Sequence, residues 1–158
     1  MLTRRYACGF LFSPDRTRVL LIRKNRPSWQ KGLLNGVGGK LEAGETPAHA
    51  MARECREETG LDLPPDAFEH VITLTGNNDG GDGGDAWEAC FFRAFAPIDR
   101  ARAMTDELLE IHPTLRVPPD VIPNLRWIIP LLLDDEPASG RYAVRVLGAP
   151  PISKDAGV

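Results

Sequence analysis

Three glutamates lie close together in the stretch RECREETGL. Glu54, Glu57 and Glu58 are spaced three and four residues apart, so they share one face if the stretch is helical. Like charges at this spacing repel, and negative charge near the C-terminal end of a helix also opposes the helix dipole. The pattern therefore predicts either a solvated acidic surface, partly neutralised by Arg53 and Arg56, or a binding site for a cation.

The residues before these glutamates favour a metal site. Mg²⁺ prefers hard oxygen ligands, retains several waters, and is typically held by a few carboxylates together with substrate phosphates. The preceding stretch GVGGK contains glycines that allow a close approach of the backbone, so a glycine carbonyl can add a neutral ligand and Lys40 can contact a phosphate. Metal ligands and a phosphate-binding group are thus predicted to converge.

The complete pattern resembles the Nudix box. Gly39 is followed after five residues by Glu45, and after seven more by RECREETGL, so that nine defined positions match over twenty-three residues. Cys55 and Leu61 fill the two apolar positions of the box. The chain is therefore identified as a member of the Nudix hydrolases, which cleave nucleoside diphosphates linked to another group with the help of Mg²⁺ or Mn²⁺.

The resemblance implies a role for each matched residue. The three glutamates are expected to be metal ligands, one of them also acting as general base toward the attacking water. Gly38 is expected to contribute its carbonyl oxygen to the metal. Arg53 is expected to pair with Glu45 and so to fix the direction in which the ligands point.

A further acid from outside the box is expected to join the metal site. The stretch MTDELLEIH offers Asp106, Glu107 and Glu110. Glu107 is favoured because the stretch resembles a Thr-Asp-Glu segment of MutT-like members, while a solvated turn is the alternative for each of the three acids.

Two asparagines are candidates for recognition of the base. The stretch LNGVGGK resembles that of MutT-like, 8-oxo-dGTP diphosphatase-like enzymes, in which the asparagine contacts the nucleotide, and this implies a substrate-binding role for Asn35. Asn124 precedes a late helix where this subgroup places an Asn or Asp that binds the purine, and an amide can both donate and accept. The alternatives are a turn residue for Asn35 and a helix N-cap for Asn124. Trp29 and Trp127 could stack on a base, although a lone tryptophan more often belongs to the core.

Basic residues are concentrated at the start of the chain. Positions 1–40 contain nine Lys and Arg residues against one acid, Asp15, although the net charge of the whole chain is −3. These residues alternate with strand-forming ones and do not form a block, which favours a solvated strand face over a stable nucleic-acid complex. Arg23 and Lys40 are the members of this group that we expect to contact the substrate.

Length and composition indicate one globular domain. The chain has 158 residues, of which 42% are hydrophobic and 26% charged, and no apolar run approaches a membrane span. The N-terminus is unlike a signal peptide, and the three cysteines lack metal or disulfide spacing, so we expect a cytoplasmic protein. We expect the domain to cover residues 1–150, with a frayed tail at 151–158, in a monomer or a homodimer.

Turn residues and periodicity predict the order of the elements. The prediction is a hairpin over 4–13 and 17–25, a loop over 26–39, a helix over 47–59, strands over 70–76 and 87–96 joined by a mobile loop, a helix over 122–135 that Pro130 kinks or interrupts, and a strand over 140–148. This mixed order predicts an α/β domain in which helices cover a sheet. The Nudix resemblance implies an α/β/α sandwich with a mixed central sheet.

The expected activity is Mg²⁺-dependent cleavage of a nucleoside triphosphate, such as an oxidised purine nucleotide like 8-oxo-dGTP, to the monophosphate and pyrophosphate. The alternatives are hydrolysis of another linked nucleoside diphosphate (ADP-ribose, NADH or a dinucleoside polyphosphate), a non-catalytic nucleotide sensor, and a structural calcium-binding domain. The intact set of glutamates argues against the sensor, because a domain without catalysis has no need of acids that repel one another.

Overall fold

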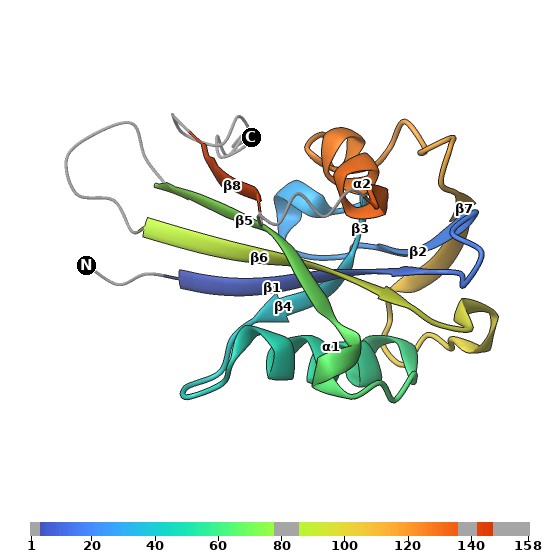
Figure 1. The fold of residues 1–158 in the computed structure, drawn as a ribbon, viewed down its shortest axis with the longest axis horizontal. Coiled ribbons are helices and arrows are strands. Elements are labelled where there is room, and N and C mark those ends of the chain that lie inside the picture. The colour runs from blue at the N-terminus through green and yellow to red at the C-terminus, as the bar shows by residue number, and fades with distance from the viewer. Residues whose placement is uncertain (1–3, 78–85, 136–141, 147–158) are drawn as a thin grey trace.

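Two helices pack on opposite faces of one mixed β-sheet in a computed structural model that describes residues 4–77, 86–135 and 142–146 (Figure 1). The helices are α1 (Pro47–Thr59) and α2 (Leu125–Leu133). The strands are β1 (Arg4–Phe12), β2 (Arg18–Arg23), β3 (Leu34–Asn35), β4 (Val37–Lys40), β5 (Glu69–Asn77), β6 (Ala86–Phe95), β7 (Leu108–Pro113) and β8 (Tyr142–Arg145). Single 3₁₀ turns are η1 (Ser28–Gln30), η2 (Pro65–Ala67) and η3 (Ile98–Arg100). This arrangement confirms the predicted α/β/α sandwich.

The sheet mixes parallel and antiparallel pairs. Its strand order is β3-β2-β1-β6-β5-β8, with β4 also paired to β1 and β7 also paired to β2. The pairs β1 with β6 and β5 with β8 are parallel, and the remaining pairs are antiparallel. The long strand β1 is therefore central, because it contacts β2, β4 and β6.

The core is divided by the sheet into two layers. Successive side chains of a strand point to opposite faces. In β1, Phe10 and Phe12 pack with the buried side of α2, whereas Ala7 and Leu11 pack with the buried side of α1. All four side chains are at most 1% exposed. Each helix is thus fixed against its own face of the same strand.

Helix α1 has the bounds predicted from its ends. The Thr46 side chain accepts a hydrogen bond from the backbone N–H of His49, Pro47 takes the first helical position, and Gly60 ends the helix with a φ of 69°. Met51 and Cys55 on the inner side are fully buried. Glu58 is also buried, so this helix carries a carboxylate into the protein instead of leaving it in solvent.

The prediction of a loop over residues 26–39 was wrong in its second half. The chain forms β3 and β4 there, and β4 pairs with β1 through Gly38 opposite Cys8 and Gly39 opposite Ala7. Glycines carry no side chains to produce an alternating apolar pattern, so the strand is defined by backbone pairing that the sequence does not display. Strand β7 was also missed, because two acids stand just before it and one within it in the stretch TDELLEIH, which resembles a solvated turn.

The late helix is shorter than the predicted 122–135 and is not capped by Asn124. Asn124 has helical backbone angles (φ −68°, ψ −21°) and its side chain makes no capping hydrogen bond within the described residues. Pro130 does not interrupt the helix, which continues to Leu133. The last strand was predicted over 140–148 and is present as β8.

The hairpin of β5 and β6 is confirmed, but the tip of its loop and the predicted tail at 151–158 lie outside the described residues. Neither helix of the described part of the chain is long and apolar enough to cross a membrane.

Gly38→Ala should destabilise the protein far more than Gly44→Ala. Gly38 has a φ of 148°, and a Cβ there would lie 2.1 Å from the carbonyl oxygen of Ala7, so β4 would have to move away from β1. Gly44 also has a positive φ, of 79°, but apart from its chain neighbours no atom lies within 4 Å of the place that a methyl group would take. We expect urea unfolding to show a loss of about 1 kcal/mol for Gly44→Ala and more than about 3 kcal/mol for Gly38→Ala. Equal losses would contradict the close packing of β4 on β1.

Candidate active site

The glutamates of α1 face the glycines of β4. The backbone N–H of Gly38 donates to Glu58 Oε2 at 2.9 Å, and a Cβ on Gly39 would lie 2.4 Å from Glu54 Oε1. The side chains of Glu54 and Glu58 are 14% and 10% exposed, whereas that of Glu57 is 53% exposed. Two carboxylates are therefore enclosed between the helix and the strand, and the third is open to an incoming ligand.

Arg53 joins four carbonyl or carboxylate groups around α1. Its Nε and Nη2 donate to the two oxygens of Glu45 at 2.9 and 3.0 Å, which is the predicted pair. Its Nη1 donates to Glu54 at 2.9 Å and to Glu57 at 3.1 Å, and Nη2 also contacts the carbonyl oxygen of Lys40 at 3.3 Å. Hydrogen bonds from this guanidinium lower the pKa of Glu45. The loop before α1 is thereby tied to the helix.

Lys24 brings a second region of the chain to the same place. Its Nζ donates to Glu107 Oε2 at 2.8 Å and lies 3.6 Å from Glu58 Oε1. The other oxygen of Glu107 accepts the backbone N–H of Asn25 at 2.8 Å, and Glu107 is only 4% exposed. Glu107, which precedes β7, is thus linked to a glutamate of α1 through one ammonium group.

The other two acids considered with Glu107 lie in different surroundings. Asp106 forms an ion pair with the exposed Arg26 at 3.0 Å. Glu110 pairs with Arg23 and His112 across β2 and β7. Of the three acids, Glu107 is the one that the structure connects with the glutamates of α1.

Burial disfavours the ionised form of the two enclosed carboxyl groups. Burial raises the pKa of Glu58 to about 7, although Lys24 and the Gly38 N–H act in the opposite direction. Burial also raises the pKa of Glu54, and the hydrogen bond from Arg53 partly offsets this rise. Both groups would therefore be stabilised in their charged form by additional positive charge.

The donor atoms fit a hard divalent cation in their chemistry. Carboxylates on one helix face beside a glycine-rich strand are the oxygen ligands that Mg²⁺ and Mn²⁺ take. As they stand in the described residues, no three His, Cys, Asp or Glu side chains converge closely enough to hold a metal ion. Arg53 forms ion pairs with Glu54 and Glu57, and Lys24 forms ion pairs with Glu58 and Glu107.

The two asparagines predicted to bind the base come from adjacent segments. Leu34 in β3 bonds through its N–H to the carbonyl of Asp120, and Ile122 bonds back to the carbonyl of Leu34. The Asn35 amide is engaged, since its oxygen accepts from the Gly36 N–H at 2.8 Å and its nitrogen donates to Gln30 at 3.1 Å. Asn124 Oδ1, in contrast, is buried without a hydrogen-bond partner in the described part of the chain.

The remaining candidates lie in different settings. Arg23 is fully engaged in ion pairs with Glu110 and Asp120, which connect β2 to β7 and to the segment before α2. Lys40 is exposed at the end of β4.

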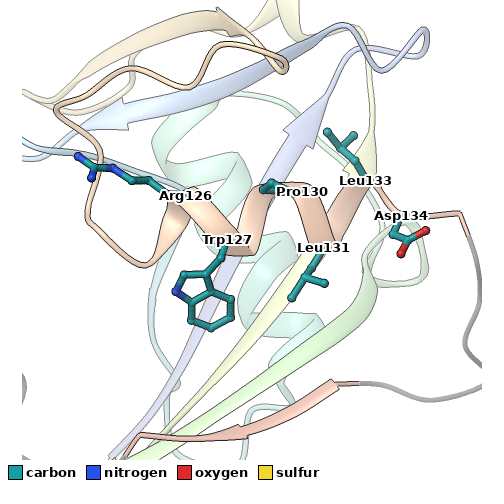
Figure 2. A pocket seen from close by; sticks show the side chains of 6 residues that line it. All are labelled: Arg126, Trp127, Pro130, Leu131, Leu133 and Asp134. Carbon is teal, nitrogen blue, oxygen red and sulfur yellow. The ribbon is translucent and has the colours of Figure 1, made fainter.

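Neither tryptophan belongs to the core, since Trp29 is 44% and Trp127 39% exposed. Trp127 and Leu131 point to the same side of α2 in an open pocket on that helix (Figure 2). The residues that line the pocket are Arg126, Trp127, Pro130, Leu131, Leu133 and Asp134.

Comparison with known proteins decides the family. Residues 2–132 match the family model described as NUDIX domain. The chain belongs to the Nudix family. The resemblance inferred from the box is thus confirmed, and the Nudix match extends well beyond the box on both sides.

Solved structures show the same fold as this Nudix chain. The MutT protein of Bacillus halodurans has a TM-score of 0.64 at 22% identity, covering 90% of this chain and 89% of that one. The MutT NUDIX hydrolase of Burkholderia pseudomallei has a TM-score of 0.63 at 21% identity, covering 84% and 99%. An octanoyltransferase of Myxococcus xanthus is 55% identical over 47 residues, which are 30% of this chain but only 13% of that protein's length.

Sequence reasoning missed Lys24 at this candidate site. Its stretch VLLIRKN is typical of a strand with polar residues at its end, and nothing in the spacing marks one of the two basic residues as buried. Arg23 was the residue predicted to bind substrate, yet its neighbour is the one that reaches the glutamates. The direction of a side chain at a strand end depends on the next turn, which the pattern does not define.

The metal-free protein should become less stable as the pH rises from about 5 to about 7. In this window the folded state keeps a proton on Glu58, whose pKa is raised to about 7, while the unfolded chain has released it near 4.5. The folded state therefore binds more protons, and raising the pH favours unfolding, by up to about 3 kcal/mol in total.

Chemical unfolding in the presence of a chelator measures this loss. Glu58→Gln should remove this part of the pH dependence, whereas Glu69→Gln at an exposed position of β5 should keep it. Identical slopes in Glu58→Gln and the unaltered protein would contradict a raised pKa at Glu58.

Proposed function

We propose that this Nudix protein is a divalent-metal-dependent pyrophosphohydrolase that cleaves a nucleoside triphosphate to the monophosphate and pyrophosphate. The observation that carries the proposal is the gathering of carboxylates from two segments, three on α1 and Glu107 before β7, beside the backbone of Gly38 and Gly39. The net negative charge of this group also supports the proposal of a bound cation. Five carboxylates, counting Glu45, face two cationic side chains.

The proposed cation is Mg²⁺, with Mn²⁺ as a substitute. Glu54, Glu57, Glu58 and the carbonyl of Gly38 would hold it, and Glu107 would be a further ligand. When bound, it neutralises charge that develops on the phosphate oxygens and lowers the pKa of a water molecule. Because the enclosed carboxylates have raised pKa values, a second positive charge there restores their ionised form.

The residues of the chain itself orient the reaction. Arg53 restrains Glu54 and Glu57 by hydrogen bonds, and the Gly38 N–H restrains Glu58, so the carboxylates are positioned before substrate arrives. One of the three glutamates takes the proton of the attacking water. Oxygen from water forms a bond to phosphorus, the bridging P–O bond breaks, and the leaving group departs with the negative charge.

Substrate contacts are proposed on both sides of this centre. Lys40 follows Gly39 and its exposed side chain can reach a phosphate. Arg23 would act on the substrate through its ion pairs, because its guanidinium already binds Glu110 and Asp120. Asp120 belongs to the segment that leads to Asn124, so Arg23 supports the place from which the base is read.

Recognition of a purine is supported by Asn124. A buried carbonyl oxygen without a donor costs free energy in the ligand-free protein, and a ligand N–H at this position would remove the cost. Asn35 lies on the neighbouring strand. An oxidised purine such as that of 8-oxo-dGTP presents both donors and acceptors along one edge, and an amide matches both.

A panel of nucleotides incubated with Mg²⁺ tests the reaction. It should include oxidised and ordinary purine triphosphates, ADP-ribose, NADH and a dinucleoside polyphosphate, with products separated by chromatography. Pyrophosphate and a monophosphate from a triphosphate are the expected products. Cleavage of another compound alone would transfer the proposal to that substrate, and binding without cleavage of any compound would show a sensor.

Glu57→Gln should lower kcat by at least about a hundredfold with little change in the melting temperature, because it removes charge at the most exposed of the glutamates. Glu69→Gln is the matched control: its carboxylate is also exposed, pairs with Arg93 on the sheet, and should leave kcat unchanged. Steady-state kinetics on the best substrate of the panel gives the comparison. Near-normal turnover by Glu57→Gln would remove the basis of the proposed mechanism.

Asn124→Leu should raise KM for the purine substrate about tenfold while kcat changes little, since one hydrogen bond to the base is lost. The same variant should be at least as stable as the unaltered protein, because it removes a buried oxygen that has no partner among the described residues. Asn124→Asp retains an acceptor and should raise KM less. A loss of stability in Asn124→Leu with an unchanged KM would show that Asn124 is structural.

A further inference from the structure

Lys24 is a buried ammonium group that two carboxylates share. Its side chain is 12% exposed, and its Nζ lies 2.8 Å from Glu107 Oε2 and 3.6 Å from Glu58 Oε1. The two carboxylates come from segments far apart in the sequence, and their own side chains are 5% and 10% exposed. A single ammonium group therefore lies at the place where the two carboxyl groups come together.

The second oxygen of Glu107 is also occupied. It accepts the backbone N–H of Asn25, the residue that follows Lys24, at 2.8 Å. The same short stretch of chain thus binds both oxygens of Glu107. Each oxygen of the carboxylate therefore already accepts a hydrogen bond from this stretch, and the Lys24 ammonium lies close to both Glu107 and Glu58, where a metal ion shared by the two acids would have to lie.

We propose that Lys24 is a positioning residue that takes the place of a divalent cation between Glu58 and Glu107, and so restricts metal binding in the absence of substrate to the side of Glu54 and Glu57. This inference rests on the proposed function, because it assumes that these glutamates bind metal. Glu107 becomes a ligand only when the Lys24 ammonium leaves it.

A purely structural lysine predicts the opposite effect on metal binding. If Lys24 only held Glu107 in place, its removal would disorder a ligand and weaken the metal site. If it competes for the site, its removal takes away a positive charge close to the incoming cation. At the effective dielectric constants of partly buried sites, one charge about 4 Å away changes the affinity for a cation by at least about tenfold.

Binding of Mn²⁺ to the nucleotide-free protein, followed by electron paramagnetic resonance of the free ion, distinguishes the two roles. Lys24→Met should bind Mn²⁺ at least about tenfold more tightly than the unaltered protein. In a chelator its melting temperature should be lower, because Glu107 loses its cation, and added Mn²⁺ should raise it by more than in the unaltered protein. Lys24→Gln, a polar variant without charge, should behave in the same way if Lys24→Met does not fold.

Two controls complete the test. Lys24→Arg retains the charge and should bind Mn²⁺ as the unaltered protein does. Arg26→Met removes a cation two residues away, in an ion pair with Asp106 whose side chains are 76% and 65% exposed, and should change neither Mn²⁺ affinity nor the melting temperature.

The gain in Mn²⁺ affinity must depend on Glu107, the acid from which the Lys24 ammonium has been removed. Adding Glu107→Gln to Lys24→Met or Lys24→Gln should abolish it, whereas Glu107→Gln alone should not tighten Mn²⁺ binding, because it removes a negative charge and leaves the Lys24 ammonium in place. If the neutral Lys24 variants bind Mn²⁺ no more tightly than the unaltered protein, the proposal is overturned. If the unaltered protein shows no Mn²⁺ binding that depends on Glu57, the proposed function itself fails, which is a separate result.

Discussion

The repulsion among enclosed carboxylates is the constraint on which the site depends. Glu54 and Glu58 lie on adjacent turns of α1 and are mostly removed from water, so each would be costly as an isolated anion. Two cationic side chains make the arrangement stable. Arg53 pairs with Glu54 and with Glu45 of the loop before α1. Lys24 pairs with Glu107 and lies close to Glu58. The remaining excess of negative charge is what the proposed metal ion would balance.

Strand β4 approaches α1 closely and brings its backbone next to the enclosed carboxylates. Gly38 and Gly39 have no side chains between the backbone and the glutamates, and any larger residue would meet either β1 or the Glu54 carboxylate. The backbone N–H of Gly38 can therefore serve as a hydrogen-bond donor to a buried anion. Because these two glycines lack side chains, the sequence of β4 shows no alternating apolar pattern. For the same reason α1 and β4 can approach closely enough to form one site.

The parts of the fold that were predictable are those with local causes. Helix α1 begins at a Thr-Pro pair and ends at a glycine with positive φ, and both features act within a few residues of the helix end. Strand β4 and strand β7 could not be predicted in this way, because β4 is half glycine and pairs with a distant strand, and β7 follows two acids and pairs with β2 far earlier in the chain. Their places are determined by partners far along the chain.

Within the candidate site too, some residues were predictable and others were not. The pair of Arg53 with Glu45 was implied by the resemblance to the Nudix box, whereas Lys24 was missed, since its contact with Glu107 joins positions 83 residues apart. Asn124 was predicted as a base-reading residue by resemblance, but only the structure shows that its side-chain oxygen has no partner among the described residues and does not cap the helix.

A very short piece of chain connects the residues proposed for base recognition with those proposed for cleavage. Asn35 lies on β3 beside the segment that leads to Asn124, and three residues later Gly38 donates to Glu58 on the opposite helix. Between them, the Asn35 side chain accepts the N–H of Gly36, which stiffens the turn from β3 into β4. In the proposed function, a base held at Asn35 would therefore fix the position of its phosphates relative to β4 through the four residues Asn35 to Gly38. Placement of the scissile bond would then depend on the same backbone that donates to the buried Glu58.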